Sequence, residues 1–198
     1  MNWREKFTST RGRFGDHLRD IFPQNVIRGV EVGTGTASHT LRMLKAHPGL
    51  HLYAIDAWDL PNPSYRAERS ICSRKMAKPV FAGKVLVKAM SALAPFKVRC
   101  VVLPGLSPEV ARRFPPAQLD FVYLDGCHLP EAVLADIDGW LPKIRRGGYI
   151  AGHDYSRKHW PGLVAQVNDL SRRLGLPVLT KPGAQPGGPE WLLGPLEG

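Results

Sequence analysis

The sequence predicts an α/β fold: a doubly wound, mostly parallel seven-stranded sheet that ends in an antiparallel hairpin. Three observations predict it. Short apolar runs alternate along the chain with segments of helical periodicity. Hydrophobic residues make up 43% and charged residues 22% of the 198 positions, as in an ordinary globular protein. Several of the apolar runs also end at a carboxylate, at the edge where parallel sheets bind ligands.

The sheet begins with the apolar run Val26–Val32, which ends in the turn Gly33–Gly35. Residues 38–47 then show helical spacing and stop at a Pro-Gly pair. The second strand, His51–Ile55, ends at an aspartate. Residues 57–79 contain three prolines and no clear period, which predicts a long loop or a broken helix.

The central elements continue the alternation. Residues 80–93 have helical periodicity, and Val98–Leu103 is the third strand. Ser107 is expected to be the N-cap of a short helix. The fourth strand, Leu119–Leu124, is followed by a predicted helix over residues 130–141.

The last third of the chain completes the sheet. The pair Gly147-Gly148 is expected to turn into a fifth strand, Tyr149–Ala151. A helix over residues 163–174 precedes two short strands, Pro177–Thr180 and Glu190–Leu193. A loop rich in Gly and Pro joins these two strands, which predicts a terminal hairpin.

Two units are expected. Residues 1–24 form a helical cap or a lid, and residues 25–198 form the main α/β domain. The N-terminal unit is expected to cover the sheet through an apolar stripe. The stripe consists of Trp3, Phe7, Phe14 and Leu18.

The cysteines and the N-terminus bear on the compartment. Cys72, Cys100 and Cys127 are an odd number without a CxxC pair, so neither a disulfide scaffold nor a cysteine-based zinc site is expected. Residues 1–20 mix charges of both signs and lack the apolar segment of a signal peptide. No apolar run approaches the ~18 residues that cross a bilayer. Together these features predict a cytoplasmic protein without membrane contact.

The chain is basic, with 27 Lys and Arg against 17 Asp and Glu and a formal net charge of +10. Much of this excess falls on residues 66–99, where nine basic residues stand against Glu68 alone. Such a segment is either a solvated helix face or a binding region for an acidic partner. Its aromatic residues are Phe81 and Phe96, too few for a base-stacking series, so nucleic acid is the lesser expectation.

Carboxylates at strand ends are the most informative pattern. Glu31, Asp56, Asp125 and Asp154 each lie at the predicted carboxyl end of a strand, where core packing does not explain an acid. Asp56 follows the first glycine of the Gly33–Gly35 turn by 23 positions, close to the ~20 expected of a carboxylate that binds a ribose. A nicotinamide fingerprint would require Gly where Ser38 stands.

These motifs resemble those of class I S-adenosylmethionine-dependent methyltransferases, and of their small-molecule O-methyltransferase branch that acts on sugars, macrolides and catechols. The resemblance rests on three motifs between Val26 and Tyr155. They are Glu31-x-Gly33-x-Gly35 with Asp56, the run Asp125-Gly-x-His128 with Asp136 and Trp140, and Gly147-Gly148-x-x-x-Gly-His153-Asp154. The resemblance implies the Rossmann-like methyltransferase fold and S-adenosylmethionine as cofactor.

The resemblance also implies a cofactor-binding set along the strand ends. Its members are Glu31, Gly33, Thr34, Gly35, Ser38, Asp56, Ala57, Trp58, Gly105, Leu106, Ser107 and Asp125. Within this set, Glu31 and the glycine turn would hold the methionine part, and Asp56 the ribose hydroxyls. Trp58 and Ser107 also have plain structural readings, as a packed aromatic and as the N-cap.

Four residues form the expected catalytic set: Asp125, His128, His153 and Asp154. Methyl transfer requires that the acceptor hydroxyl be aligned and made nucleophilic. Either a histidine takes its proton, or Mg²⁺ bound by Asp125 and Asp154 lowers its pKa. Catechol-type relatives place an Asp-Asp or Asp-Asn pair where this chain has His153-Asp154, which weakens the case for Mg²⁺.

The sequence therefore predicts O-methylation of a small-molecule hydroxyl, with an acidic acceptor as one option. Two alternatives stay open: an RNA or tRNA methyltransferase, suggested by charge, and a non-catalytic cofactor-binding interaction module. A nicotinamide oxidoreductase is a third, weaker reading. The sequence leaves the oligomeric state open, a homodimer included.

Overall fold

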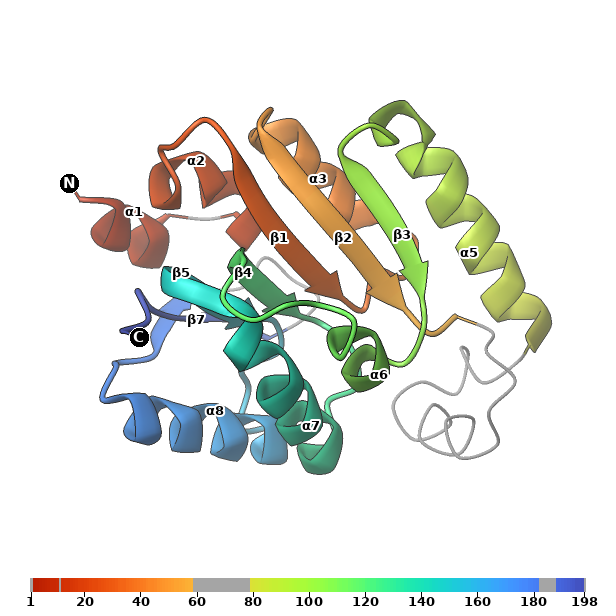
Figure 1. The fold of residues 1–198 in the computed structure, drawn as a ribbon. Helices are drawn as coiled ribbons and strands as arrows, with labels where there is room; N and C mark the ends of the chain where they lie inside the picture. The colour runs from red at the N-terminus through yellow and green to blue at the C-terminus, as the bar shows by residue number, and fades with distance from the viewer. Residues whose placement is uncertain (1, 11, 59–78, 182–187, 198) are drawn as a thin grey trace.

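A computed structural model describes residues 2–10, 12–58, 79–181 and 188–197 of the chain. The chain forms one seven-stranded sheet with the order β3-β2-β1-β4-β5-β7-β6 (Figure 1). Strands β1 to β5 are parallel neighbours, and β7 pairs antiparallel with both β5 and β6. This order confirms the predicted fold class, including the terminal hairpin.

Except at the start of β5, the strand boundaries lie close to the predicted ones. They are β1 (Ile27–Val32), β2 (Leu50–Asp56), β3 (Cys100–Pro104), β4 (Leu119–Leu124), β5 (Ile144–Gly152), β6 (Leu179–Lys181) and β7 (Glu190–Leu193). Every residue of the central strand β4 is buried, as expected for a strand covered on both faces.

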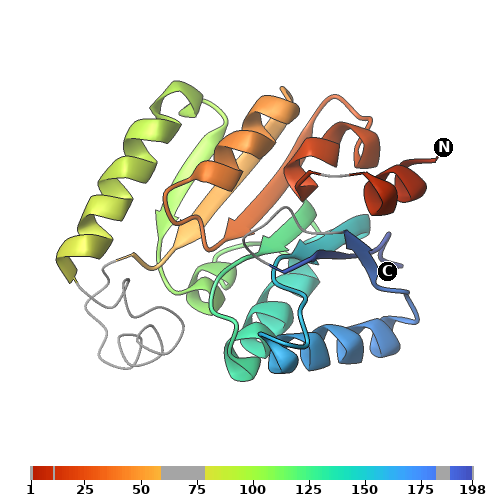
Figure 2. The ribbon, with the colours of Figure 1, turned by 180° about the vertical axis from the view of Figure 1, so that it is seen from behind.

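Helices cover both faces of the sheet. Helices α1 (Trp3–Ser9), α2 (Leu18–Ile21), α3 (Ser38–Ala46) and α5 (Pro79–Leu93) lie on one face (Figures 1 and 2). Helices α6 (Ser107–Ala111), α7 (Pro130–Trp140) and α8 (Pro161–Leu174) lie on the other face. Short 3₁₀ turns occur at η1 (Phe14–His17), η2 (Ala94–Phe96) and η3 (Leu141–Lys143).

The core accordingly has two apolar layers, one on each side of the sheet. The N-terminal segment belongs to the first of them. Phe7, Phe14 and Leu18 are fully buried, and the Phe14 ring lies 5.3 Å from Phe121 of β4 and 5.2 Å from Tyr123 of β4. The predicted apolar stripe is therefore buried, although two short helices and a 3₁₀ turn carry it.

Two local expectations are wrong. The pair Gly147-Gly148 lies inside β5, because a register shift between β4 and β5 lets the strand begin before a glycine with φ of 77°. Ser107 is the first residue of α6 and not its cap, which is Leu106. The Ser107 hydroxyl instead accepts a hydrogen bond from Trp140 Nε1 at 2.8 Å.

Residues 59–78, which make up nearly all of the predicted loop over residues 57–79, lie outside the described residues, and so do residues 66–78 of the basic segment 66–99. Within the described part of the basic segment, Lys84, Lys88 and Lys97 are exposed. Arg99 has a structural role, since its guanidinium donates to backbone carbonyls of Leu44, His47 and Leu50.

Candidate active site

The predicted site residues meet because the carboxyl ends of four neighbouring strands are in register. Val32 of β1 pairs with Ile55 of β2 and with Leu124 of β4, and Leu124 pairs with Gly152 of β5. The residues that follow these strands therefore lie side by side along one edge of the sheet. The amide of Asp125 donates to the Val32 carbonyl at 2.8 Å, and that of His153 donates to the Leu124 carbonyl at 3.1 Å.

The turn after β1 has the geometry of a ligand cradle. Gly33 has φ of 89°, and a Cβ there would lie 2.0 Å from the carbonyl oxygen of Asp125. Gly35 has φ of 52°, and a Cβ there would meet no atom within 4 Å. Glycine is thus required at position 33 by packing, while the space beside Gly35 is open to a ligand. Thr34, between them, is buried.

Asp56 ties this turn to the end of β2. Its carboxylate accepts from the amide of Gly35 at 2.9 Å and from the amide of Trp58 at 2.8 Å. The Trp58 indole is fully buried and donates from Nε1 to the Gly35 carbonyl at 3.0 Å. The plain structural reading of Trp58 as a packed aromatic therefore holds, and the two backbone amides hold the Asp56 carboxylate in place.

The third predicted cofactor segment lies next to Asp56. The amide of Gly105 donates to the Asp56 backbone carbonyl at 3.0 Å, which places residues 105–107 at the same sheet edge. Ala57 is buried beside Trp58. Ser38, in contrast, is exposed at the start of α3.

Glu31 is engaged by its own chain. Its carboxylate is fully buried, lies 2.9 Å from His39 Nδ1, and accepts from the Thr40 hydroxyl. Both partners come from α3, so Glu31 fixes this helix against β1. A direct cofactor contact of Glu31 is a prediction that these bonds do not by themselves support.

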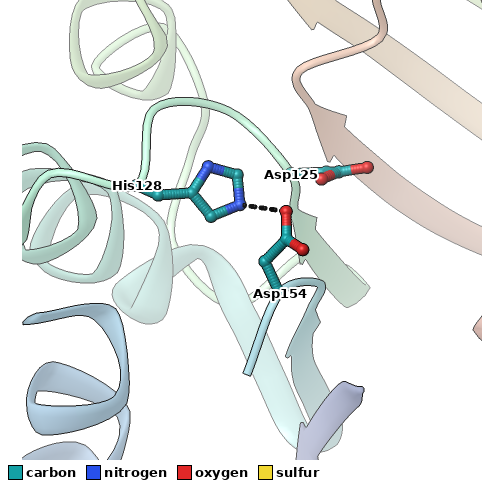
Figure 3. Close-up of side chains that lie close together, drawn as sticks. All are labelled: Asp125, His128 and Asp154. Carbon is teal, nitrogen blue, oxygen red and sulfur yellow. Dashed lines mark ion pairs between the residues drawn. The ribbon is translucent and has the colours of Figure 1, made fainter. Parts of the chain in front are cut away.

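The predicted catalytic residues cluster where β4 and β5 end (Figure 3). His128 Nε2 lies 3.0 Å from Asp154 Oδ2, without the alignment of a full hydrogen bond. One ligating atom from each of Asp125, His128 and Asp154 lies within 4.8 Å of the others. The His128 ring stacks on Trp160 with centroids 4.9 Å apart, which fixes the plane of the imidazole.

His153 is more buried than His128, and its two nitrogens face opposite charges. Nδ1 lies 3.3 Å from Asp154 Oδ2 and 3.7 Å from Asp125 Oδ1. Nε2 lies 3.0 Å from a guanidinium nitrogen of Arg13. Arg13 also lies 3.4 Å from Glu190, which accepts from the Tyr123 hydroxyl at 2.7 Å.

Burial and neighbouring charges shift the carboxyl groups in opposite directions. Burial raises the pKa of Asp125 to about 6, although His153 and His128 oppose it. Burial raises the pKa of Asp154, but the adjacent His128 and His153 imidazoles and a hydrogen bond from the Gly188 amide hold it well below the usual range. Asp154 is therefore the carboxylate that stays ionised at neutral pH.

For His153, burial and the neighbouring carboxylates shift the pKa in opposite directions. Burial lowers its pKa, and the Asp154 and Asp125 carboxylates raise it, with a net upward direction. A proton on Nε2, however, would face the Arg13 guanidinium, which has only donors, at 3.0 Å. The arrangement in the structure is thus that of a neutral ring protonated on Nδ1.

Sequence reasoning missed Arg13, His39 and Glu190. Arg13 lies 140 positions from its partner His153 along the chain. Glu190 lies 176 positions from its partner Phe14. No spacing rule signals such contacts. Glu190 at the start of a predicted buried strand is an acid that packing does not explain, and that signal was available.

One further expectation fails in this region. Cys127, between Asp125 and His128, is disulfide-bonded, whereas Cys100 is a free buried thiol. The cysteine count therefore no longer supports the predicted compartment. None of the described helices is long and apolar enough to span a membrane.

Comparison with known proteins now bears on this geometry. A family model described as a methyltransferase domain matches residues 30–155, which is more than half of the chain. The chain belongs to the methyltransferase-domain family. The match begins in β1 and ends just after His153-Asp154, so it includes every strand end described above. A sequence search of curated proteins gives no significant match.

Solved structures share the fold of this methyltransferase. A cofactor-bound protein from Mycobacterium tuberculosis has a TM-score of 0.68 at 16% identity, covering 96% of this chain and 83% of that one. An O-methyltransferase from Bacillus cereus, solved with S-adenosylhomocysteine, has a TM-score of 0.62 at 15% identity, covering 97% and 86%. A precorrin-6y C5,15-methyltransferase from Geobacter metallireducens has a TM-score of 0.54 at 16% identity, covering 85% and 78%.

At such identities the likeness shows the fold, and the differing names of these proteins show that the fold does not fix the acceptor. The predicted family and enzyme class are confirmed by the domain match. The individual site residues, the domain division and the partners stay predictions.

Proposed function

We propose that this methyltransferase transfers the methyl group of S-adenosylmethionine to a hydroxyl of a small molecule, with His128 as general base. The observation that carries the proposal is the contact of His128 with the ionised carboxylate of Asp154 at the carboxyl ends of the strands. Among the described residues, the other ring nitrogen of His128, Nδ1, has no hydrogen-bond partner, so it is available to accept a proton.

The turn after β1 and the carboxylate at the end of β2 suit S-adenosylmethionine as the ligand. The open, left-handed Gly35 and the doubly accepting Asp56 lie together beside β1, as a ligand with a polar end and a ribose requires. The Gly33–Gly35 turn would hold the methionine end, Asp56 the ribose, and residues 57–58 and 105–107 the adenine side. When bound, S-adenosylmethionine supplies an electrophilic methyl group on a sulfonium.

The chain's own residues then prepare the acceptor. His128 accepts the hydroxyl proton on Nδ1 as the oxygen attacks, and Asp154 stabilises the imidazolium through Nε2. Trp160 keeps the ring in plane during this transfer. The precise alignment of hydroxyl and methyl group accounts for much of the rate of such displacements.

The side chains that converge at this site do not fit Mg²⁺. Only two carboxylates converge, and the third ligating group is an imidazole, which hard cations disfavour. Position 153 supplies no oxygen, and the Nε2 of His153 is already paired with Arg13. One Asp154 oxygen also accepts from the Gly188 amide at 2.8 Å.

The first test is ligand binding followed by turnover. Calorimetry with S-adenosylhomocysteine is expected to show binding, and calorimetry with NAD none. Transfer of a labelled methyl group is then measured on catechols, sugars and macrolides, with acidic members included and with EDTA or Mg²⁺ added. Turnover that persists in EDTA supports the histidine mechanism, and turnover that requires Mg²⁺ contradicts it.

A base variant sharpens the test. His128→Gln is expected to lower methyl transfer by roughly 10²–10⁴-fold while S-adenosylhomocysteine binds as before. His159→Gln, on the loop before α8, is the matched control and is expected to change neither quantity. Cofactor binding without turnover on any acceptor would instead favour a non-catalytic module, and salt-sensitive methylation of RNA would favour an RNA methyltransferase.

A further inference from the structure

Arg13 brings a permanent positive charge from the N-terminal segment to the catalytic cluster. It precedes η1 and lies outside the matched methyltransferase domain of residues 30–155. Its side chain is only 24% exposed and its guanidinium lies 3.0 Å from His153 Nε2. The described N-terminal segment thus contacts a residue of the predicted catalytic set directly.

Glu190 holds Arg13 on the side away from His153. Its Nε lies 3.4 Å from Glu190 of β7, a side chain that is 2% exposed. Glu190 also accepts from the amide of Phe14, next to Arg13, and from the Tyr123 hydroxyl at 2.7 Å. A carboxylate with these partners holds both the backbone and the side chain at this point, so the guanidinium has little freedom to leave His153.

This contact assigns the hydrogen on His153. A guanidinium has donors only, so Nε2 of His153 must accept, and the ring hydrogen must be on Nδ1. Nδ1 faces Asp154 Oδ2 at 3.3 Å. His153 is therefore a donor to Asp154, with no lone pair left for an acceptor hydroxyl, whereas His128 retains a free nitrogen.

We propose that Arg13 is a positioning residue for methyl transfer: it holds His153 as an Nδ1–H donor to Asp154 and thereby keeps that carboxylate turned toward His128. The chain of contacts runs from Glu190 through Arg13, His153 and Asp154 to His128. Arg13 touches neither ligand in this account, and its effect on rate depends on the function proposed above.

The first test reads the hydrogen position and needs no acceptor. Nitrogen NMR of histidine-labelled protein distinguishes ring nitrogens that carry a hydrogen from those that do not. In the wild type, His153 is expected to show Nδ1 protonated and Nε2 free of hydrogen. In Arg13→Met, which removes the donor, the hydrogen is expected to move to Nε2 or both nitrogens to be protonated. Unchanged His153 signals in a folded Arg13→Met protein would overturn the proposal.

Two further variants distinguish loss of the Arg13–His153 contact from a general loss of structure. Arg13→Lys keeps a charged donor and is expected to keep most of the wild-type His153 signature, so it remains informative if Arg13→Met does not fold. Arg42→Met is the matched control. Arg42, on α3, lies 3.0 Å from Asp16 of the same N-terminal segment but does not contact the catalytic cluster. It is expected to leave the His153 signals unchanged.

The second test reads turnover on whichever hydroxyl acceptor the panel identifies. Arg13→Met is expected to lower kcat roughly 10–100-fold, as for other residues that orient a functional side chain, with the dissociation constant for S-adenosylhomocysteine unchanged. Arg13→Lys should recover part of that loss. A purely structural role would instead lower cofactor binding and kcat together, without recovery by Lys.

The two tests separate the proposals. If no acceptor is methylated but the NMR signature responds to Arg13, the proposed function fails and the assignment of His153 stands. If turnover is found and His128 is essential, while Arg13→Met alters neither kcat nor the His153 signals, the role of Arg13 is refuted and the function stands.

Discussion

At the scale of single residues, Asp56 has a structural role and is also the predicted ribose ligand. Its two oxygens already hold the amides of Gly35 and Trp58, so a ribose would bind to a carboxylate that is fixed in place. Removing it loses the hydroxyl contacts and loosens the turn that carries Gly35. The two effects act in the same direction on cofactor affinity.

Asp56→Ala is therefore expected to weaken S-adenosylhomocysteine binding by ~1.5–3 kcal/mol, the range for hydrogen bonds to a charged group. Calorimetry measures the change. Asp169→Ala, an exposed carboxylate on α8, is the control and is expected to bind as the wild type does. Equal affinity of all three proteins would show that the cofactor lies elsewhere.

Asp136, on α7, is a second acid with an unusual setting. It is 6% exposed, and burial raises the pKa of its carboxyl to about 7, although the Ser107 hydroxyl opposes the shift. The unfolded chain releases this proton near the model-compound value of 3.8, while the folded chain keeps it. Stability from this group is thus complete at acid pH and is lost as the pH rises from about 4 to about 7.

Asp136→Asn removes this dependence and is expected to raise the free energy of unfolding at pH 8 by roughly 2–4 kcal/mol, with little gain at pH 4. Thermal unfolding at both pH values measures it. Asp169→Asn, on a solvated helix face, should change stability little at either. A gain of the same size at pH 4 and pH 8 would contradict the assigned pKa.

At the scale of elements, Lys181 of β6 holds the N-terminal helix. Its ammonium is fully buried and donates to the Phe7 carbonyl at 3.0 Å and to the Thr10 carbonyl at 2.5 Å. These carbonyls belong to the last turn of α1 and to the residue after it. The helix dipole also stabilises a cation at this end of the helix. The C-terminal hairpin and the N-terminal helix therefore stabilise each other.

Lys181→Met keeps the apolar part of the side chain but leaves two carbonyls without a donor. It is expected to lower the free energy of unfolding by roughly 2–4 kcal/mol, as measured by denaturant titration. Lys6→Met breaks only a half-exposed pair with Asp20 and should cost less than about 1 kcal/mol. Similar losses for the two variants would argue against this anchor.

Element identity was largely readable from sequence, and cap identity was not. Apolar runs of the right length predict strands because both faces of a parallel sheet are buried. Ser107 fits an N-cap by residue type, yet its hydroxyl accepts from Trp140, which local sequence does not reveal. Likewise the Gly147-Gly148 pair predicts a turn, but both residues lie inside β5, where the pairing with β4 shifts register.

At the scale of the whole molecule, the N-terminal segment packs into the same apolar layer as one face of the sheet. Phe7, Phe14 and Phe22 are buried against the sheet, and the Phe22 ring lies 5.6 Å from Phe121. Deletion of residues 1–22 would expose the aromatic face of β4 and remove Arg13 from the site. Such exposure of apolar surface removes the dominant stabilising effect.

The truncated chain 23–198 is therefore expected to lose cooperative thermal unfolding, and circular dichroism on heating measures this. Deletion of Met1 alone, which keeps the Asn2 cap of α1, is the control and should unfold as the full chain does. A truncated protein that melts cooperatively near the wild-type temperature would support the predicted division into a cap of residues 1–24 and a separate domain.

The sequence by itself determined the α/β class, the order of elements, and the carboxylates at the strand ends, because each of these depends on local spacing. Tertiary structure alone decided what each histidine of the site contacts. The reason is physical: Arg13 lies 140 positions from His153 along the chain, and folding brings its guanidinium to 3.0 Å from His153 Nε2. The motifs were enough to predict the family, whereas only the contacts across the sheet show which partners the side chains of the candidate site have.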